Sequence, residues 1–308
     1  MSKTAIVFAG QGAQFVGMGK DLVDAYPVCR ALYEEADAVL GYSLSKLCFE
    51  GPLEDLTKSN HCQPAIFVTS MACYRALQEK VPGLAPVAMA GLSLGEWSAL
   101  HAAGVLGFAD TLRILQARGA AMQVACEEKP GGMVSVMGLG RSDLEAICGE
   151  AGVEMANLNS EEQTVLSGST AGIEKAEALA KARGAKRAIV LEVAGAFHSS
   201  LMQSAVEKLA AVLGDVVFTA PAVPVVSNVT GAFHGDTDAI RREMLRQVTG
   251  SVHWYEGVGV MTAAGADTFV ECGPGKVLSG LIKRIAKGAS LTNIQDTASL
   301  AAAAAALV

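Results

Sequence analysis

The stretch VAMAGLSLGEWSALHAAG, residues 87–104, decides the fold class of this chain. An apolar run leads into Gly-x-Ser-x-Gly, centred on Ser93, and a helix-compatible stretch follows. This is the layout of a nucleophile elbow, a sharp strand-to-helix turn that leaves no room for a Cβ at Gly91 and Gly95. A chain with 33 glycines also produces this pattern by chance. The apolar run before it and the helical stretch after it favour the elbow.

Apolar runs and helical patterns alternate on both sides of the elbow, which predicts a parallel α/β sheet. The expected strands are residues 6–8, 87–89, 224–228 and 268–272. The expected helices are residues 21–40, 65–79 and 111–125, with a last helical run at 301–306.

The segment Pro-Gly-Gly at 130–132 interrupts this alternation. From there the pattern predicts strand, helix, strand, strand, helix and strand, at residues 133–137, 141–150, 153–157, 164–167, 171–183 and 187–193. This is the βαββαβ order of a ferredoxin-like unit. We therefore expect an inserted small domain at residues 129–197. Residues 1–128 and 198–308 then form a large, α/β-hydrolase-like domain with a parallel sheet.

Composition excludes several classes of protein. The formal net charge of −7 disfavours nucleic acid as a partner. The sequence has no run of about 18 apolar residues, so no membrane span is predicted. The first residues lack the features of an export signal. Seven cysteines without a Cys-x-x-Cys pair favour a reducing cytoplasm over a disulfide framework or structural zinc site.

A serine hydroxyl needs a neighbouring base, most often histidine, to become a nucleophile at neutral pH. Of five histidines, His198 lies where the small domain returns to the large one, and clefts form at such junctions. It is our candidate base, expected within about 3.5 Å of Ser93; the alternative is a histidine that caps a helix starting near Ser199. His61 and His234 are interpreted as surface residues. His101 is expected to point away from the nucleophile, and His253 to start a helix or to pack.

Two further features suggest anion binding. The glycine-rich segment 8–14 follows the first expected strand, and its backbone N–H groups can face a phosphate or an oxyanion. Its spacing is not that of a dinucleotide site, so an oxyanion donor loop facing Ser93 fits better. Arg118 stands alone in a largely apolar helix and needs an anion, either a structural carboxylate or one on the substrate.

Motifs along the whole chain carry a resemblance to one family. They lie at residues 8–14, 63–64, 91–96, 118–122, 131–133, 157–168, 197–202, 226–231 and 271–278. Taken together, the chain resembles the malonyl-CoA:acyl carrier protein transacylases of bacterial fatty acid synthesis, which are related to the acyltransferase domains of polyketide synthases.

The resemblance implies a cofactor-free, ping-pong transfer of malonyl from malonyl-CoA to acyl carrier protein. Ser93 is the implied nucleophile and His198 the base, while the N–H groups of Gln11 and Leu94 hold the oxyanion. A backbone carbonyl from the position of His253 is expected to orient the base. The implied substrate-binding residues are Arg118, which pairs with the malonyl carboxylate, and Gln63, Met122, Met133, Asn159 and Phe197.

The chain departs from the family pattern at Leu92, where histidine is more usual, which leaves substrate preference open. Phe197 resembles the malonyl-selecting form of the related acyltransferases. Pocket shape of this kind discriminates one carbon by about 1–3 kcal/mol.

An acidic carrier protein needs a local basic patch on this acidic chain. The favoured set follows Gly-Pro-Gly at 273–275, near a strand end where parallel sheets place ligands: Lys276, Lys283, Arg284 and Lys287. The other set closes the small domain: Lys181, Arg183, Lys186 and Arg187. Ordinary solvated helix faces are the alternative for both.

Two rival functions stay open at this point. A serine esterase or thioesterase of α/β-hydrolase type shares the elbow but needs an acid between the serine and a late histidine. A non-catalytic scaffold that binds carrier protein would leave Ser93 idle, and the presence of Ser93, His198, Gln11 and Arg118 speaks against it.

Overall fold

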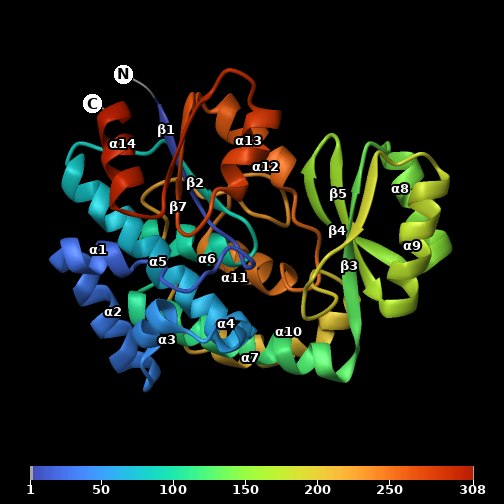
Figure 1. Cartoon of the computed structure of the whole chain (residues 1–308), viewed down its shortest axis with the longest axis horizontal. Coiled ribbons are helices and arrows are strands. Elements are labelled where there is room, and N and C mark those ends of the chain that lie inside the picture. The colour runs from blue at the N-terminus through green and yellow to red at the C-terminus, as the bar shows by residue number, and fades with distance from the viewer. Residues whose placement is uncertain (1–2, 308) are drawn as a thin grey trace.

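Two four-stranded sheets organise the computed structural model, which describes residues 3–307 (Figure 1). The first sheet is parallel throughout, in the order β2 (Ala88–Gly91), β1 (Thr4–Phe8), β7 (Thr268–Cys272) and β8 (Ser290–Ile294). All five residues of β1 are buried, as expected for a parallel strand covered on both faces. The predicted α/β class with a parallel sheet is confirmed.

Helices cover both faces of this sheet. Ile6 and Phe8 pack into one core with α5 (Ser59–Lys80) and α7 (Phe108–Glu128), whereas Ala5 and Val7 pack into a second core with α12 (Trp254–Ala263) and α13 (Val277–Ile285). The helices of the large domain are α1 (Lys20–Ala25), α2 (Pro27–Leu40), α3 (Leu44–Glu50), α4 (Leu53–Thr57), α5 (Ser59–Lys80), α6 (Leu94–Ala102), α7 (Phe108–Glu128), α10 (Gln203–Leu213), α11 (Thr237–Arg246), α12 (Trp254–Ala263), α13 (Val277–Ile285) and α14 (Thr297–Leu307). A 3₁₀ turn, Ser200–Met202, precedes α10.

Three expected elements of the large domain differ from the structure. The helix expected at 21–40 is two helices, because Tyr26 is extended and Pro27 starts α2. The strand expected at 224–228 is reduced to isolated bridges, in which Val225 pairs with Met89 and Val226 with Phe233. The edge strand β8 was not expected, because its sequence SLTNI is only partly apolar.

The second sheet is antiparallel, in the order β4 (Val153–Ser160), β5 (Gln163–Ser169), β3 (Gly131–Met137) and β6 (Arg187–Val190). Its helices α8 (Arg141–Ala151) and α9 (Thr170–Ala182) lie together on one face, at the right of Figure 1. This is the predicted βαββαβ unit, and its last strand ends at Val190 rather than at 193. The elements fall within the expected range 129–197; the domain boundaries themselves stay a prediction.

The small sheet turns its other face toward the large domain, where β4 contacts α12 and α13. All seven cysteines are free. Across residues 3–307, no group of three or more His, Cys, Asp or Glu side chains is arranged to hold a metal ion. In that range no helix is both long enough and apolar enough to cross a membrane.

Candidate active site

The elbow has the sterics that its glycines predict. Ser93 follows β2 and is the N-cap of α6, with φ 54° and ψ −103°. A Cβ on Gly91 would lie 2.0 Å from the carbonyl carbon of Gly95, and a Cβ on Gly95 would lie 2.2 Å from the carbonyl oxygen of Phe8. Neither glycine tolerates a side chain, because backbone atoms of the turn occupy the space.

The side chain of Asn228 stabilises this turn through two hydrogen bonds to its main chain. Its Oδ1 accepts a hydrogen bond of 2.6 Å from the N–H of Ser93, and its Nδ2 donates to the carbonyl of Gly91 at 2.8 Å. The hydroxyl of Ser93 does not cap α6. It therefore stays available for chemistry although it sits at a helix N-terminus, where serine hydroxyls ordinarily act as caps.

His198 meets Ser93 as predicted, with Nε2 2.8 Å from Oγ. Nδ1 lies 2.8 Å from the carbonyl of Gln247 and 3.2 Å from that of Gly250. Because a carbonyl only accepts, Nδ1 carries the hydrogen and Nε2 is left as the acceptor for the Ser93 hydroxyl. Ser93 and His198 are the two non-glycine residues with positive φ in the described part of the chain. Backbone strain is thus concentrated on the candidate nucleophile and base.

The environment keeps His198 neutral. Burial, followed by the nearby charge of Arg118, lowers the pKa of His198 to about 4, and the two backbone carbonyls only partly oppose this. A neutral imidazole at physiological pH can take a proton from Ser93.

The orienting role expected of His253 is wrong. His253 is the N-cap of α12, and its carbonyl accepts from the N–H of Gly257 at 3.0 Å as the first bond of that helix. Gln247 and Gly250, which the sequence reasoning missed, supply the carbonyls instead. The available signal was the end of α11, because the last carbonyls of a helix have no partner within it and Gln247 is the C-cap.

Arg118 reaches the nucleophile from α7. It is 1% exposed; its Nη1 donates to Gln63 Oε1 at 2.8 Å, and its Nη2 to Gln247 Oε1 at 3.0 Å and Ser93 Oγ at 3.2 Å. Burial lowers its pKa to about 10, against the opposing charge of Glu96, so the guanidinium is charged at neutral pH. Within residues 3–307 no carboxylate forms an ion pair with it, and its Nε has no partner. The structure thus presents a buried cation without an anion beside the candidate nucleophile.

The two expected oxyanion donors flank Ser93. Gln11 follows β1, and its side chain is fixed by hydrogen bonds to Ser59 and Gln63. Leu94 is the first residue of α6, where N–H groups point out of the helix. No acceptor for the N–H of Gln11 or Leu94 is found in the described part of the chain. Both can donate to an oxyanion.

A cleft of about 300 Å³ opens onto Ser93 between the two sheets. Four expected substrate-binding residues line it together with Leu92: Met122, Met133, Asn159 and Phe197. Oδ1 of Asn159 is buried without a hydrogen-bond partner. Gln63 does not line the cleft; its side-chain oxygen instead accepts a hydrogen bond from Arg118.

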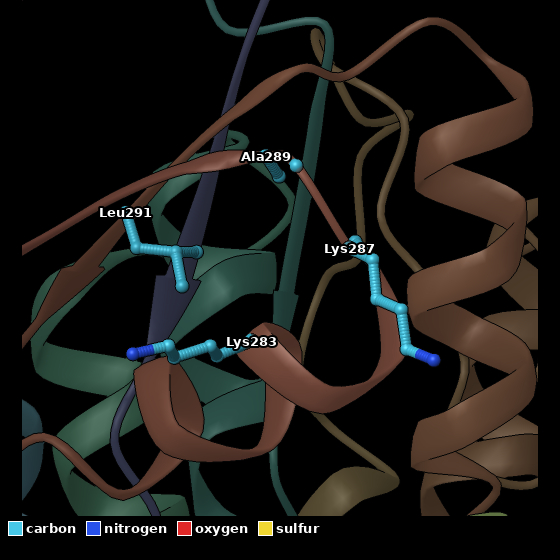
Figure 2. A pocket seen from close by; sticks show the side chains of 6 residues that line it. Lys283, Lys287, Ala289 and Leu291 are labelled. Carbon is cyan, nitrogen blue, oxygen red and sulfur yellow. The ribbon is translucent and has the colours of Figure 1, made fainter.

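The two basic sets differ in their partners. In the small-domain set, Lys181 pairs with Glu177, Arg183 with Glu150, and Lys186 with Glu162. For the set that follows the Gly-Pro-Gly turn, no ion pair occurs among residues 3–307. Val277 and Leu281, in the first half of α13, line the cleft, but Lys283 and Lys287 line a separate hollow around the C-terminal end of that helix. Figure 2 shows their ammonium groups directed to opposite sides of that hollow.

One histidine is not where its sequence context placed it. His234 was expected on the surface because its neighbours are polar, yet its side chain is 0% exposed and lies between Glu96 and Glu243. A single polar stretch does not reveal a long-range contact of this kind.

The chain is similar to known proteins along almost its whole length. The acyl transferase domain family matches residues 5–302. The malonyl CoA-acyl carrier protein transacylase of Escherichia coli (strain K12) is 43% identical over 98% of this chain and 99% of its own length. The crystal structure of MCAT from Streptococcus pneumoniae has a TM-score of 0.94 and 42% identity over 99% of this chain and 100% of that one.

A further solved structure is a malonyl-transacylase in complex with a type II polyketide synthase acyl carrier protein; it has a TM-score of 0.95 and 42% identity over 99% of this chain and 100% of that one. Sequence and fold agree, and the chain belongs to the acyl transferase domain family.

Proposed function

We propose that this protein transfers the malonyl group of malonyl-CoA to the phosphopantetheine thiol of an acyl carrier protein, through a malonyl ester on Ser93. The names of its relatives support the substrate and the partner. The reaction uses no cofactor, since both half-reactions exchange a thioester and an ester through side chains of this chain. The seven free cysteines support a place in the cytoplasm.

In the first half-reaction, Ser93 Oγ attacks the thioester carbonyl carbon while His198 Nε2 takes the hydroxyl proton. The carbonyl oxygen becomes an oxyanion held by the N–H groups of Gln11 and Leu94. When the carbon–sulfur bond breaks, His198 gives its proton to the departing CoA sulfur. The carbonyls of Gln247 and Gly250 stabilise the transient imidazolium through its Nδ1 hydrogen.

In the second half-reaction, the thiol of the carrier protein gives its proton to His198 and attacks the same ester carbon. Collapse of the oxyanion releases Ser93 Oγ, which takes the proton back. The same side chains serve in both directions because an acyl ester and a thioester pass through equivalent tetrahedral intermediates.

One observation carries the choice of acyl group: Arg118 Nη2 and His198 Nε2 both lie within hydrogen-bond distance of Ser93 Oγ. A guanidinium at that place can hold a carboxylate carried by the acyl group in a bidentate pair. Substrate binding neutralises Arg118 and removes one cause that lowers the pKa of His198. The base therefore becomes stronger when a malonyl group is in place.

The esterase alternative is less well supported. An α/β-hydrolase triad orients its histidine with an acid, whereas here two backbone carbonyls face His198 Nδ1.

Radiolabelled malonyl-CoA tests the proposal, with and without holo acyl carrier protein. Label is expected on Ser93 first, and then on the carrier protein with little free malonate. Release of the label mainly as malonate would establish a hydrolase, and no label on Ser93 or on the carrier would establish a scaffold.

A further inference from the structure

A continuous row of largely buried polar side chains extends away from the active site, starting at Gln247, which accepts a hydrogen bond from Arg118. It passes from Gln247 through Glu96 and His234 to Glu243, and these residues come from three segments of the chain: α6, the loop before α11, and α11 with its C-cap. The acyl-transfer chemistry described above uses none of the last three residues. Burying the ionisable side chains of Glu96 and His234 is costly unless they are paired, so their arrangement needs a reason.

His234 is held between two carboxylates. Its Nε2 lies 2.7 Å from Glu96 Oε1, and its Nδ1 lies 2.8 Å from Glu243 Oε2, at ion-pair distance although out of line for a hydrogen bond. Burial alone would lower the pKa of His234, but the hydrogen bond and charge of Glu96, together with Glu243, raise it above the ordinary value. The two carboxylates on either side of the ring favour the imidazolium form of His234.

Glu96 occupies the third position of α6, one turn after the nucleophile. A glutamate there often reaches back to the N–H of the N-cap residue. Here Asn228 already holds the N–H of Ser93, and Glu96 points the other way, with one oxygen on His234 and the other on Gln247. Both oxygens of a buried carboxylate are therefore satisfied by side chains outside its own helix.

Gln247 has one orientation that satisfies all its contacts. Its Nε2 donates to Glu96 Oε2 at 2.5 Å and to the carbonyl of Ser93 at 2.9 Å, and both of these atoms only accept. Its Oε1 is thereby turned to accept from Arg118 at 3.0 Å. A reversed amide would face Arg118 with its own donors, so Glu96 fixes which end of Gln247 meets the guanidinium.

We propose that the triad of Glu243, His234 and Glu96 positions Arg118 through the amide of Gln247 and keeps the guanidinium free for the carboxylate of the acyl group. The inference rests on the proposed malonyl transfer. His234 supplies the counter-charge that Glu96 would otherwise seek in Arg118, the other buried cation near it. These residues are positioning residues, because none of them contacts Ser93 Oγ.

Loss of the triad therefore has a selective consequence. Without the charge of His234, Glu96 draws Arg118 toward itself and competes with the substrate carboxylate. The pair of Ser93 and His198 is unaffected, because His198 is oriented by the main chain of Gln247 and Gly250. Acylation by malonyl-CoA should fall, whereas acylation by acetyl-CoA, which lacks the carboxylate, should not.

The test compares initial rates of Ser93 acylation by malonyl-CoA and by acetyl-CoA, followed by intact-protein mass spectrometry. The variants are His234→Gln, which removes the charge but keeps an N–H donor, Glu96→Gln, Glu243→Gln, and the double variant His234→Gln/Glu96→Gln. His101→Gln is the matched control, since that imidazole bonds the carbonyl of Leu106 and packs between Phe67 and Phe108. The melting temperature of each variant is measured alongside.

We expect His234→Gln and Glu96→Gln to lower the malonyl rate about 10-fold or more, mainly through a higher KM, with the acetyl rate changed less than about twofold. The double variant should be no worse than Glu96→Gln, because both act through one carboxylate. Glu243→Gln should lower the malonyl rate in the same way but by less. If Glu96→Gln does not fold, the malonyl-to-acetyl ratios of His234→Gln and Glu243→Gln test the proposal.

An unchanged malonyl-to-acetyl ratio, whether or not both rates fall, overturns the positioning role. The control His101→Gln is expected to change both rates equally, through stability alone. Failure of the proposed function is a separate result, because the unmodified protein would then form no malonyl adduct on Ser93.

Discussion

Two segments meet at Ser93, and they differ in how their residues are brought there. The elbow, residues 88–102, is built from contacts between near neighbours, and a Cβ at Gly91 would overlap with Gly95 only four residues away. The segment 225–253, which we call the support segment, reaches the elbow across more than 100 residues of sequence, through Asn228 and Gln247. The first segment shapes the nucleophile, and the second fixes the base and the arginine.

The contrast explains where interpretation of the sequence succeeds. Gly-x-Ser-x-Gly constrains its own backbone, so Ser93 and its strand-turn-helix setting were predictable. Both wrong interpretations, of His234 as a surface residue and of His253 as the orienting residue, fall in the support segment. The atoms that were misjudged are main-chain carbonyls and the members of a buried ion pair, and neither has a signature in a single sequence.

Removal of the reacting groups should give the largest effect. Ser93→Ala is expected to abolish the malonyl-enzyme, and His198→Ala to slow both half-reactions by about 10²–10⁴-fold or more, since the general base is lost. Stopped-flow acylation and transfer to carrier protein measure the two steps. A stable malonyl label on the Ser93→Ala variant would disprove the role of Ser93.

Arg118→Ala should raise the barrier to malonyl transfer by about 2–5 kcal/mol, a loss of roughly 30-fold to several thousand-fold in rate, because the malonyl carboxylate loses its buried partner charge. Transfer of acetyl should rise relative to malonyl. Equal loss for both acyl groups would indicate a purely structural arginine.

The same variant tests the electrostatics of the base. The pKa of His198 is lowered to about 4, so the neutral, basic form persists as the pH falls, and the rate of acetylation by acetyl-CoA should decline only near that value. Removal of the Arg118 cation should move this acid limb to higher pH, toward the ordinary value of about 6.5. An unshifted limb would show that burial alone sets the pKa.

Gly95→Ala tests whether steric contacts between near neighbours shape the elbow. The new Cβ would lie 2.2 Å from the carbonyl oxygen of Phe8, so we expect a loss of stability of about 1–3 kcal/mol or more, with lower activity toward both acyl groups. Gly149→Ala in α8 is the matched control; its Cβ meets nothing within 4 Å, and helix propensity favours alanine by up to about 1 kcal/mol. Urea unfolding measures both, and equal stabilities would contradict a steric origin of the elbow.

The smallest effect is expected at the docking surface. Lys283→Glu/Arg284→Glu should raise the KM for carrier protein, on the order of a few-fold, and flatten its salt dependence while leaving acylation by malonyl-CoA intact. Lys181→Glu/Lys186→Glu is the comparison variant, because those lysines already pair with acids. An unchanged KM in the first variant would remove that patch from the mechanism.

The fold was predictable to a greater extent than the site. Alternating apolar runs gave the parallel sheet, and the Pro-Gly-Gly break at 130–132 preceded the ferredoxin-like unit, because both patterns follow from local periodicity. The edge strand β8 was missed since its residues are only half-buried. At the site, Arg118 stood out as an unpaired charge in an apolar helix, whereas Gln247 did not, since a polar residue at a helix end is ordinary.

A crystal structure of the malonyl-enzyme would show directly whether Arg118 binds the acyl carboxylate. We expect an ester on Ser93 Oγ, with its carbonyl oxygen between the N–H groups of Gln11 and Leu94. We also expect the free carboxylate to form a bidentate pair with Arg118, while Gln247 still accepts from the guanidinium. A malonyl carboxylate that points into the cleft toward Asn159, with Arg118 bound only to Gln63 and Gln247, would contradict it.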